Sequence, residues 1–226
     1  MCMNKVIDIQ KAVDMVHDGD SIMFGGFEHI GSPRNLIQAL SRTGVKNLHV
    51  IADDIGCVAR GFSQTLDSLL KNGQIASAKC CFLGMNPDAS RLYLDGKLDV
   101  EFIPMGTLAE RIRAGGCGMG GFYTRTGVGT LVEEGKETKI INGEKYLLEL
   151  PIHAAVAFVK AYRADKMGNA IFKYTANNLN TVMATAADLV ILEAEEVVEV
   201  GEIEPDRVQL PGVFIDYVVE AKEAVL

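Results

Sequence analysis

The first half of the chain alternates between short apolar runs and segments in which apolar residues recur at helical spacing. The short runs predict strands, because a strand that is buried on both faces forms a continuous hydrophobic run. The predicted strands begin at Ser21, Leu48, Ala78 and Val100, and the predicted helices occupy residues 8–19, 32–44, 63–72, 88–96 and 107–114. The predicted N-cap residues of three of these helices are Asp8, Ser32 and Thr107. This alternation is typical of a mostly parallel sheet with helices on both faces.

The second half has longer strand-like runs and fewer helical segments. Residues 139–150 contain two such runs around Asn142 and Gly143, a dipeptide that favours a tight β-hairpin turn. Further core strands are predicted at residues 155–162 and 188–194, and mixed strand and loop from residue 199 onward. No repeat or low-complexity segment divides the chain. We therefore expect one domain over residues 1–226: an α/β fold with an open, mostly parallel sheet flanked by helices, and β-hairpins in the C-terminal half.

The composition narrows the class of protein. A chain of 226 residues with 48% hydrophobic positions is long enough to bury a sizeable core. Its formal net charge of −8 argues against nucleic acid or an anionic membrane as a main partner. No apolar run is long enough for a transmembrane helix, and the N-terminal residues lack the apolar stretch of a signal peptide. We therefore expect a cytoplasmic protein.

The cysteines and histidines show no metal-binding pattern. The five cysteines form no C-x-x-C pair, so buried or free thiols are expected. The four histidines lack metal-ligand spacing, and no metal site is expected. His49 lies inside a predicted strand and is interpreted as structural, whereas His29 lies in a glycine-rich turn and is a candidate functional residue. The run Glu193, Glu195 and Glu196 is interpreted as a solvated strand end.

Three glycines separate the first predicted strand from the next helix, which Ser32 and Pro33 are expected to open. They are Gly25, Gly26 and Gly31. Ligands of open α/β sheets bind beyond the carboxyl ends of the strands, and a helix N-terminus can offer N–H groups to an anion. The spacing does not match the dinucleotide motif G-x-G-x-x-G. The turn is equally compatible with a ligand site and with a tight structural turn.

Two further segments are candidates for a site. Asp53 and Asp54 follow the second predicted strand, where a carboxylate pair can either face a substrate or cap a turn. Residues 115–135 are rich in glycine but match neither the dinucleotide motif nor a P-loop. Within them, Tyr123, Thr124 and Arg125 are compatible with a ligand phosphate and equally with an interface.

Residues 20–33 resemble the signature of the family I CoA-transferases, in particular the alpha subunit of the 3-oxoacid and acetoacetate type. The matching positions are an apolar triplet at 22–24, the run Gly25-Gly26-Phe27, Gly31 and Pro33. The similarity continues through residues 106–137, 166–172 and 176–180. It covers nearly the whole chain, and the block at 106–137 is much more specific than a glycine motif alone.

This resemblance implies that CoA moves from an acyl-CoA to a free short-chain carboxylic acid by ping-pong chemistry. A glutamate attacks the thioester and forms an acyl-glutamyl anhydride, then a glutamyl-CoA thioester. In this family the glutamate belongs to a beta subunit, and its Ser-Glu-Asn-Gly-like motif does not occur in this chain. The resemblance therefore implies no catalytic residue here, a beta-subunit partner in an α2β2 heterotetramer, and a CoA thioester as substrate with no permanently bound cofactor.

The resemblance also implies which residues wall the shared site: Gly25, Gly26, Phe27, His29, Gly31, Asp53, Asp54, Met105, Gly106 and Phe122. Three of these depart from the family pattern. Met105 stands where relatives often have Gln, and Asp53 and Asp54 stand where Asn is frequent. Met cannot donate a hydrogen bond, and two acids repel a carboxylate unless one is protonated or paired. A different acid is therefore expected, either less polar near Met105 or bearing a cationic group. The alternatives are a nucleotide-dependent oxidoreductase and a non-enzymatic ligand sensor on an α/β scaffold.

Overall fold

A computed structural model describes residues 4–61 and 65–221 of the chain. Its body is an eight-stranded sheet with the order β11-β10-β8-β1-β2-β3-β4, in which β9 also pairs with β8. All neighbours along that path are parallel, and β9 is antiparallel to β8. The strands are β1 (Ser21–Phe24), β2 (Leu48–Ile51), β3 (Ile75–Cys80), β4 (Asp99–Phe102), β8 (Ala154–Asp165), β9 (Ala170–Ile171), β10 (Ala187–Val198) and β11 (Tyr217–Glu220). The structure confirms the predicted α/β class and the mostly parallel sheet.

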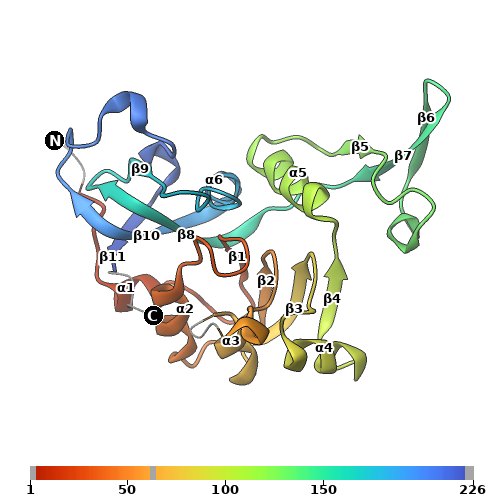
Figure 1. The fold of residues 1–226 in the computed structure, drawn as a ribbon, viewed down its shortest axis with the longest axis horizontal. Coiled ribbons are helices and arrows are strands. Elements are labelled where there is room, and N and C mark those ends of the chain that lie inside the picture. Colours follow the sequence, from red (N-terminus) through yellow and green to blue (C-terminus); the bar gives the residue numbers. More distant parts are fainter. Residues whose placement is uncertain (1–3, 62–64, 222–226) are drawn as a thin grey trace.

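Helices cover both faces of the body (Figure 1). One face packs against α1 (Ile9–Val13), α2 (Arg34–Ser41), α3 (Asp67–Lys71) and α4 (Pro87–Leu94). The other packs against α5 (Met105–Gly116) and α6 (Asn180–Met183). Short 3-10 helices occupy Val58–Arg60, Leu131–Glu133, Pro205–Arg207 and Gly212–Phe214. Within residues 4–61 and 65–221, no helix is long and apolar enough to cross a membrane.

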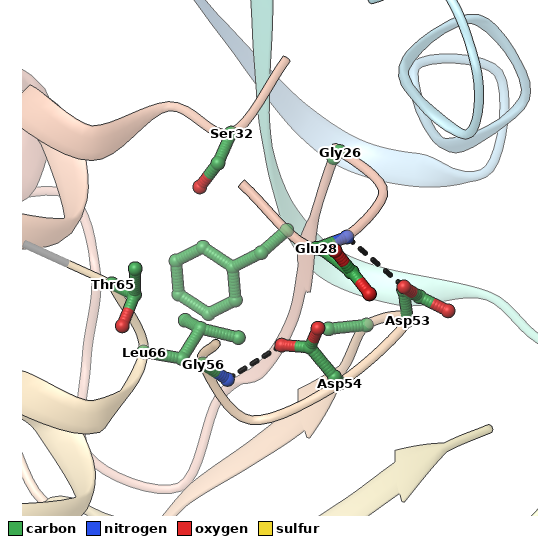
Figure 2. Close-up of a pocket in the computed structure, with 11 residues that line it drawn as sticks. Gly26, Glu28, Ser32, Asp53, Asp54, Gly56, Thr65 and Leu66 are labelled. Atoms are coloured by element: carbon green, nitrogen blue, oxygen red, sulfur yellow. Dashed lines mark hydrogen bonds between the residues drawn. The ribbon is translucent and has the colours of Figure 1, made fainter. Parts of the chain in front are cut away.

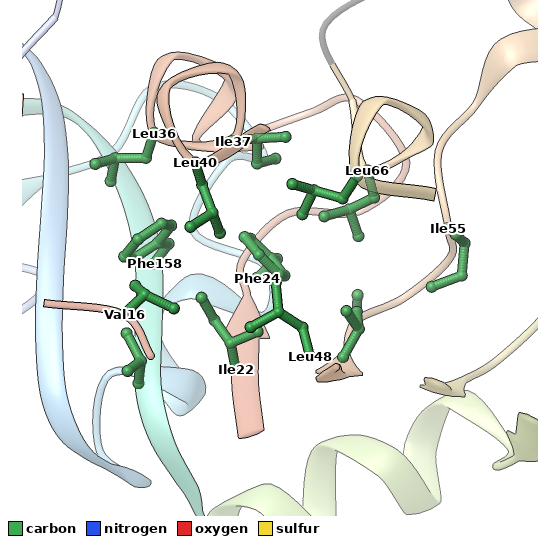
Figure 3. Close-up of a cluster of buried hydrophobic side chains, with 14 of the residues drawn as sticks. Val16, Ile22, Phe24, Leu36, Ile37, Leu40, Leu48, Ile55, Leu66 and Phe158 are labelled. Atoms are coloured by element: carbon green, nitrogen blue, oxygen red, sulfur yellow. The ribbon is translucent and has the colours of Figure 1, made fainter. Parts of the chain in front are cut away.

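The sheet separates two hydrophobic cores. Because successive side chains of a strand point to opposite faces, Ile22 and Phe24 of β1 join the core under α2, and Met23 joins the core on the other face. On the first face, α2 packs its apolar side over Phe24 and Phe158, as Figure 3 shows. These two rings meet edge to face, with centroids 5.7 Å apart. This packing holds the β1–α2 connection against the centre of the sheet.

The two longest strands continue beyond the end of β1. Phe24, the last residue of β1, pairs with Phe158, and β8 then runs on beside β10 to Asp165. Lys160 and Glu193 are register partners in this extension. The extension therefore forms a wall that rises past the carboxyl ends of the neighbouring strands.

A second, three-stranded sheet projects from the body beyond α5 (Figure 1). It consists of β5 (Phe122–Thr124), β6 (Thr138–Ile141) and β7 (Glu144–Glu149), in the antiparallel order β5-β7-β6. We call residues 120–150 the arm. Asn142 and Gly143 join β6 to β7 with φ angles of 52° and 81°, as a tight hairpin turn requires. The hairpin prediction is confirmed.

Several predicted boundaries are shifted. The first helix ends at Val13 rather than near Gly19, and the third strand begins at Ile75 rather than Ala78. Pro104, not Thr107, precedes the first residue of α5, and Thr107 lies inside the first turn. The Asp8 prediction is confirmed, because its side chain accepts a hydrogen bond from the N–H of Gln10. The helix predicted at 63–72 begins at Asp67, and residues 63 and 64 lie outside the described residues.

Two predictions around α2 and β10 are wrong for one shared reason. Ser32 does not cap α2: the helix begins at Arg34, and its N-cap residue, Pro33, makes no side-chain hydrogen bond. The oxygens of Glu193 take that role, accepting from the Leu36 N–H at 2.9 Å and the Asn35 side chain at 3.0 Å. Glu193 is therefore fully buried rather than part of a solvated strand end. A carboxylate near a helix N-terminus is favoured by the helix dipole and its unpaired N–H groups.

Candidate functional site

The parallel strands β1 to β4 end at one edge of the sheet, and the polar candidates lie just beyond it. Gly25 and Gly26 follow β1, Asp53 and Asp54 follow β2, and Cys81 follows β3. The Cys81 N–H donates to the Asp53 carbonyl at 2.8 Å, so the segments after β2 and β3 remain paired beyond the strands. This is the edge at which open α/β sheets bind ligands.

A small pocket opens between the glycine turn and the acid pair (Figure 2). We call it the acid pocket. Its cavity volume is about 20 Å³, enough for one water-sized group. Its lining comprises Phe24, Gly25, Gly26, Glu28, Ser32, Ala52, Asp53, Asp54, Gly56, Thr65 and Leu66. Four of the sequence-predicted residues, Gly25, Gly26, Asp53 and Asp54, are therefore brought together here.

The glycines of the turn are required by close approach to neighbouring atoms. A Cβ on Gly25 would lie 1.8 Å from Oδ1 of Asn180, and a Cβ on Gly31 would lie 2.7 Å from the Ala176 carbonyl oxygen. Gly26 and Gly31 also have φ angles of 118° and 72°, which side-chain-bearing residues rarely adopt. The turn thus needs glycine in order to pack against α6 and the loop before it.

Asn180 holds the turn in place. It is fully buried, and its Oδ1 accepts a hydrogen bond from the Lys160 N–H at 2.8 Å. Its Nδ2 donates to the carbonyls of Gly31 at 2.9 Å and Ala176 at 2.7 Å. One side chain therefore joins α6, β8 and the glycine turn. The sequence reasoning did not single out Asn180, although it lies in the block 176–180 that carried the resemblance.

The two aspartates are buried and each uses one oxygen. Oδ2 of Asp53 accepts from the Glu28 N–H at 3.0 Å, and Oδ1 of Asp54 accepts from the Gly56 N–H at 2.6 Å. Their other oxygens have no hydrogen-bond partner within the described part of the chain. Burial raises the pKa of Asp53 despite the Glu28 N–H bond. Burial, with smaller contributions from the charges of Asp53 and Glu28, raises the pKa of Asp54 to about 6.

Two thiols lie beside the acids but are not activated. Burial, followed by the charges of Asp54 and Asp53, raises the pKa of Cys80 to about 12. Burial and the charge of Asp53 likewise raise the pKa of Cys81 to about 12. Both thiols are therefore protonated near neutral pH, and the thiolate is the nucleophilic form. The Cys81 sulfur lies 3.7 Å from the Met105 sulfur at the start of α5.

The other predicted residues fall in three places. His29 and Gly31 line a second, larger pocket of about 220 Å³, which shares no lining residue with the acid pocket. Phe27 is 44% exposed and caps the tip of the turn, where its backbone pairs with Ile30. Met105 lies next to Cys81, and Gly106 follows it in α5. Phe122 lies on β5 of the arm and lines neither pocket.

Sequence reasoning missed the buried charges of the second pocket. Lys160 is 3% exposed, and its ammonium group lies 3.4 Å from Glu195 and 3.9 Å from Glu193. Burial raises the pKa of Glu193. The available signal was a lysine inside the apolar run at 155–162.

The described cysteines, Cys57, Cys80, Cys81 and Cys117, are free thiols as predicted, whereas Cys2 lies outside the described residues.

The histidine predicted to be structural, His49, lies at the surface. His49 is exposed on β2, and its Nδ1 lies 2.8 Å from the Ser77 hydroxyl, in keeping with its structural interpretation. Across the described residues, no group of three or more His, Cys, Asp or Glu side chains is arranged to hold a metal ion. The chemistry at the sheet edge therefore centres on the buried acids and the glycine turn.

The fold and site together define an α/β protein with a polar pocket beyond the carboxyl edge of a parallel sheet. The family model for coenzyme A transferase matches residues 6–221, so the chain belongs to the coenzyme A transferase family. It is 41% identical over 220 residues to the alpha subunit of the acetate CoA-transferase of Escherichia coli K12, with 97% of this chain and 98% of that protein covered. It is 47% identical over 218 residues to the A subunit of the probable succinyl-CoA:3-ketoacid coenzyme A transferase of Bacillus subtilis, with 96% and 90% covered.

Solved structures share the fold. The acyl-CoA transferase YdiF of E. coli O157:H7, as its thioester complex with CoA, superposes with a TM-score of 0.86 at 23% identity over 97% of this chain. This chain covers 47% of that longer chain, about half of its length. Glutaconate CoA-transferase of Acidaminococcus fermentans gives a TM-score of 0.81 at 21% identity, with 96% and 76% of the two chains covered. A variant of the decarboxylase AibA/AibB gives 0.80 at 24% identity over 98% and 84%, so the fold alone does not specify the reaction.

Proposed function

We propose that this chain is the alpha subunit of a two-chain enzyme that transfers CoA between an acyl-CoA and a free short-chain carboxylic acid. The observation that carries the proposal is the similarity to alpha and A subunits over 98% and 90% of their lengths. Family membership favours this function over that of a nucleotide-dependent oxidoreductase or a ligand sensor. The expected location is the cytoplasm, where we expect the acyl-CoA to be found.

In the proposed reaction, a glutamate carboxylate from the beta subunit first attacks the thioester carbonyl and expels the CoA thiolate. The thiolate then attacks the glutamyl carbonyl of the resulting anhydride, which releases the first carboxylate and leaves a glutamyl-CoA thioester. The acceptor carboxylate repeats both steps in reverse and departs as the new acyl-CoA, with the glutamate regenerated. Covalent catalysis divides one difficult exchange into easier steps.

The chemistry of the sheet edge supports placing the nucleophile on another chain. Each buried aspartate already binds a backbone N–H through one oxygen, and the pocket beside the two acids, at about 20 Å³, holds a water-sized group rather than an acyl group. Cys80 and Cys81 are held as thiols. The proposed role of the glycine turn and the acids is to form one wall of a site that excludes water, since water would hydrolyse the anhydride.

We assign the selection of the acceptor acid to Asp53, Asp54 and Met105. A second carboxylate on the acceptor would meet the repulsion of Asp53 and Asp54. We therefore expect a preference for acceptors whose far end is apolar or cationic over dicarboxylates. Asp54→Asn and Met105→Gln should shift the ratio of kcat/KM toward the dicarboxylate, and an unchanged ratio in both variants would remove the acids and Met105 from substrate selection.

The proposed assembly is an α2β2 heterotetramer. The arm carries exposed apolar residues that a partner chain could cover, with Leu131 82%, Ile140 64% and Leu150 57% exposed. Native mass spectrometry of the enzyme purified from its source should show two copies of each chain. A stable assembly of this chain alone with transferase activity would contradict both the stoichiometry and the location of the nucleophile.

The first test traps the covalent intermediate. The enzyme is purified with its co-purifying chains, incubated with acyl-CoA, reduced with borohydride and mapped by mass spectrometry. Hydride converts a glutamyl thioester into a primary alcohol and releases CoA, so the modified glutamate is identified by its mass. Modification on a second chain supports the proposal, and modification on this chain contradicts the location of the nucleophile. Glu28→Gln is the matched control, because Glu28 lines the acid pocket in this chain and its removal should leave the labelling intact.

A further inference from the structure

A further pocket lies away from the glycine turn, beside the segment that joins β7 of the arm to β8 of the body (Figure 1). It is bounded by β1, β2 and β3, by Arg111 of α5 and by residues 151–153. Its volume is about 190 Å³, enough for several water-sized groups but below the usual range for a drug-sized ligand. It shares no lining residue with the acid pocket or with the pocket beside His29. We call it the basic pocket.

The polar side chains of the basic pocket can all donate hydrogen bonds, and none of the described residues that line it is acidic. They are Ser21, His49, Ser77, Lys79, Arg111 and His153. Such a lining contrasts with the net charge of the chain, which is −8. A concave surface of this kind attracts an anion.

The cations beside the pocket outnumber the carboxylates with which they pair. Lys79 and Arg111 both pair with Glu101. Arg111 and Lys136 both lie beside the buried Glu149. Three cations therefore share two carboxylates, which leaves an excess of one positive charge. An anion in the pocket would balance that charge.

Two of the donors are held in place and keep unused hydrogen-bonding capacity. The Arg111 guanidinium has five N–H donors, and its hydrogen bonds to the Leu150 carbonyl and Glu101, at 2.8 and 2.5 Å, use two of them. The His49 ring is fixed by the contact of its Nδ1 with the Ser77 hydroxyl at 2.8 Å, which leaves Nε2 for a ligand. Arg111 is 8% exposed, and a guanidinium matches the planar geometry of a carboxylate.

The remaining lining of the basic pocket is apolar. Val50, Ile51 and Ile152 are buried, and Pro151 lies beside them. Apolar surface gains from contact with a hydrocarbon group, whereas a fully polar ion would lose hydration against it. The two kinds of lining therefore match a ligand with one charged end and one apolar end.

We propose that the basic pocket binds a small monocarboxylate with a short aliphatic tail, its carboxylate held by Arg111, His49 and Lys79. The tail lies against Ile51 and Ile152. The pocket is independent of the proposed transferase reaction, because it shares no residue with the sheet edge. A bound acid would join β2, β3 and α5 to the base of the arm, so its occupancy would stabilise the position of the arm.

The test maps the protection of individual histidines by a ligand in the assembled enzyme. Diethyl pyrocarbonate acylates accessible histidine rings, and mass spectrometry measures the extent at each position. Butyrate is the probe, butyramide is its uncharged counterpart, and sodium chloride is added at equal ionic strength. Butyrate should protect His49 and His153, both exposed in this chain, in a saturable manner. Butyramide and chloride should not. His17 is the internal control, since its side chain is 77% exposed and lies outside the pocket.

The variants test the excess charge. Lys79→Met should raise the butyrate concentration for half-protection about tenfold, through the loss of one charge-assisted contact. Lys79→Arg keeps the charge and should restore the wild-type value. Lys71→Met is the matched control, because Lys71 pairs with Asp67 at 2.7 Å on α3, outside the pocket. It removes the same charge from the chain and should leave the half-protective concentration unchanged.

Several outcomes would overturn the proposal. Equal protection by butyramide or chloride would remove the requirement for a carboxylate, and equal protection of His17 would show that butyrate acts on the reagent. An unchanged half-protective concentration in Lys79→Met would also count against the site. If His49 and His153 fail to react in the ligand-free enzyme, another chain covers this face of the sheet and the pocket is an interface.

Discussion

The body and the arm of this protein are stabilised by different interactions. The body has a hydrophobic core on each face of its sheet, and strand β1 contributes buried side chains to both. Among the strands of the arm, Leu147 is the fully buried apolar residue, whereas Ile140 is 64% exposed. The arm relies instead on charge pairs and on its attachment to α5.

That attachment centres on two buried charges. Glu149 is 1% exposed and lies 2.5 Å from Lys136 within the arm and 3.8 Å from Arg111 of α5. The Arg111 Nε donates to the Leu150 carbonyl at 2.8 Å, and its guanidinium pairs with Glu101 on β4. Hydrophobic burial is non-directional, whereas an ion-pair network needs its geometry held. The core of the body therefore holds the site, whereas the position of the arm depends on a few buried charges.

The largest expected effect comes from breaking the core of the body. Phe158→Ala removes a fully buried ring that meets Phe24 edge to face. The free energy of unfolding should fall by about 3–5 kcal/mol, through lost burial and the cavity left behind. Urea denaturation measures it. Leu131→Ala in the arm is the control, because Leu131 is 82% exposed and should cost less than about 0.5 kcal/mol. Equal losses would show that the arm is packed as firmly as the body.

The next effect concerns the anchor of the arm. Glu149→Gln leaves Lys136 and Arg111 without their buried carboxylate and should destabilise the arm by about 3 kcal/mol. Hydrogen exchange followed by mass spectrometry should show faster exchange in β5, β6 and β7 and unchanged exchange in β1 and β2. Acceleration spread evenly over the body would contradict a separate arm unit.

A pH-dependent change of about 1–3 kcal/mol in the free energy of unfolding is expected from Asp54 in the body, because burial disfavours its charged form. Its pKa is about 6 in the folded chain against 3.8 for the ordinary group, so its favourable contribution is present below 3.8 and lost as pH rises through 6. Asp54→Asn should therefore gain stability relative to the wild type between pH 4 and pH 7. Thermal denaturation of both proteins across that range measures the difference. A stability difference that is independent of pH, or of opposite sign, would contradict a raised pKa of the buried Asp54 carboxyl.

The smallest effect is expected for an exposed pair in the arm. Arg125 and Glu144 lie 2.6 Å apart, with side chains 64% and 49% exposed. Glu144→Gln should cost at most about 1 kcal/mol, because solvent screens such pairs. Beside Glu149→Gln, it separates the effect of burial from that of charge in the same small sheet. A loss as large as that of Glu149→Gln would mean that charge alone holds the arm.

Local features of the fold could be predicted from the sequence because they depend on neighbours along the chain. The order of strands and helices follows from hydrophobic period, and Asp8 caps the N–H of a residue two positions away. Asn142 and Gly143 make the hairpin turn through their own φ angles. Boundaries were less accurate, as for β3, because helix and strand ends are decided by packing as well as by local preference.

The site was predictable only in part for the same reason. Strand ends marked Gly25, Gly26, Asp53 and Asp54, and the structure brings all four to one pocket. Nothing local indicated that a fully buried glutamate would bind the start of α2, since the two partners are 157 positions apart. The charges of residues 193–196 suggested a solvent-exposed segment. The register of β10 against β8 instead places Glu193 in the protein interior.

By itself, then, the sequence determined the α/β class, the glycine turn and the acid pair, all of which follow from local period and residue chemistry. Tertiary structure alone decided that Asn180 would occupy the space left by the absent Cβ of Gly25, and that Lys160 and Glu193 would meet inside the sheet. It also decided that the residues of one glycine turn would line two different pockets. The physical reason is that register and packing pair residues far apart in the chain. The hydrophobic period of a segment does not identify the segment against which it packs.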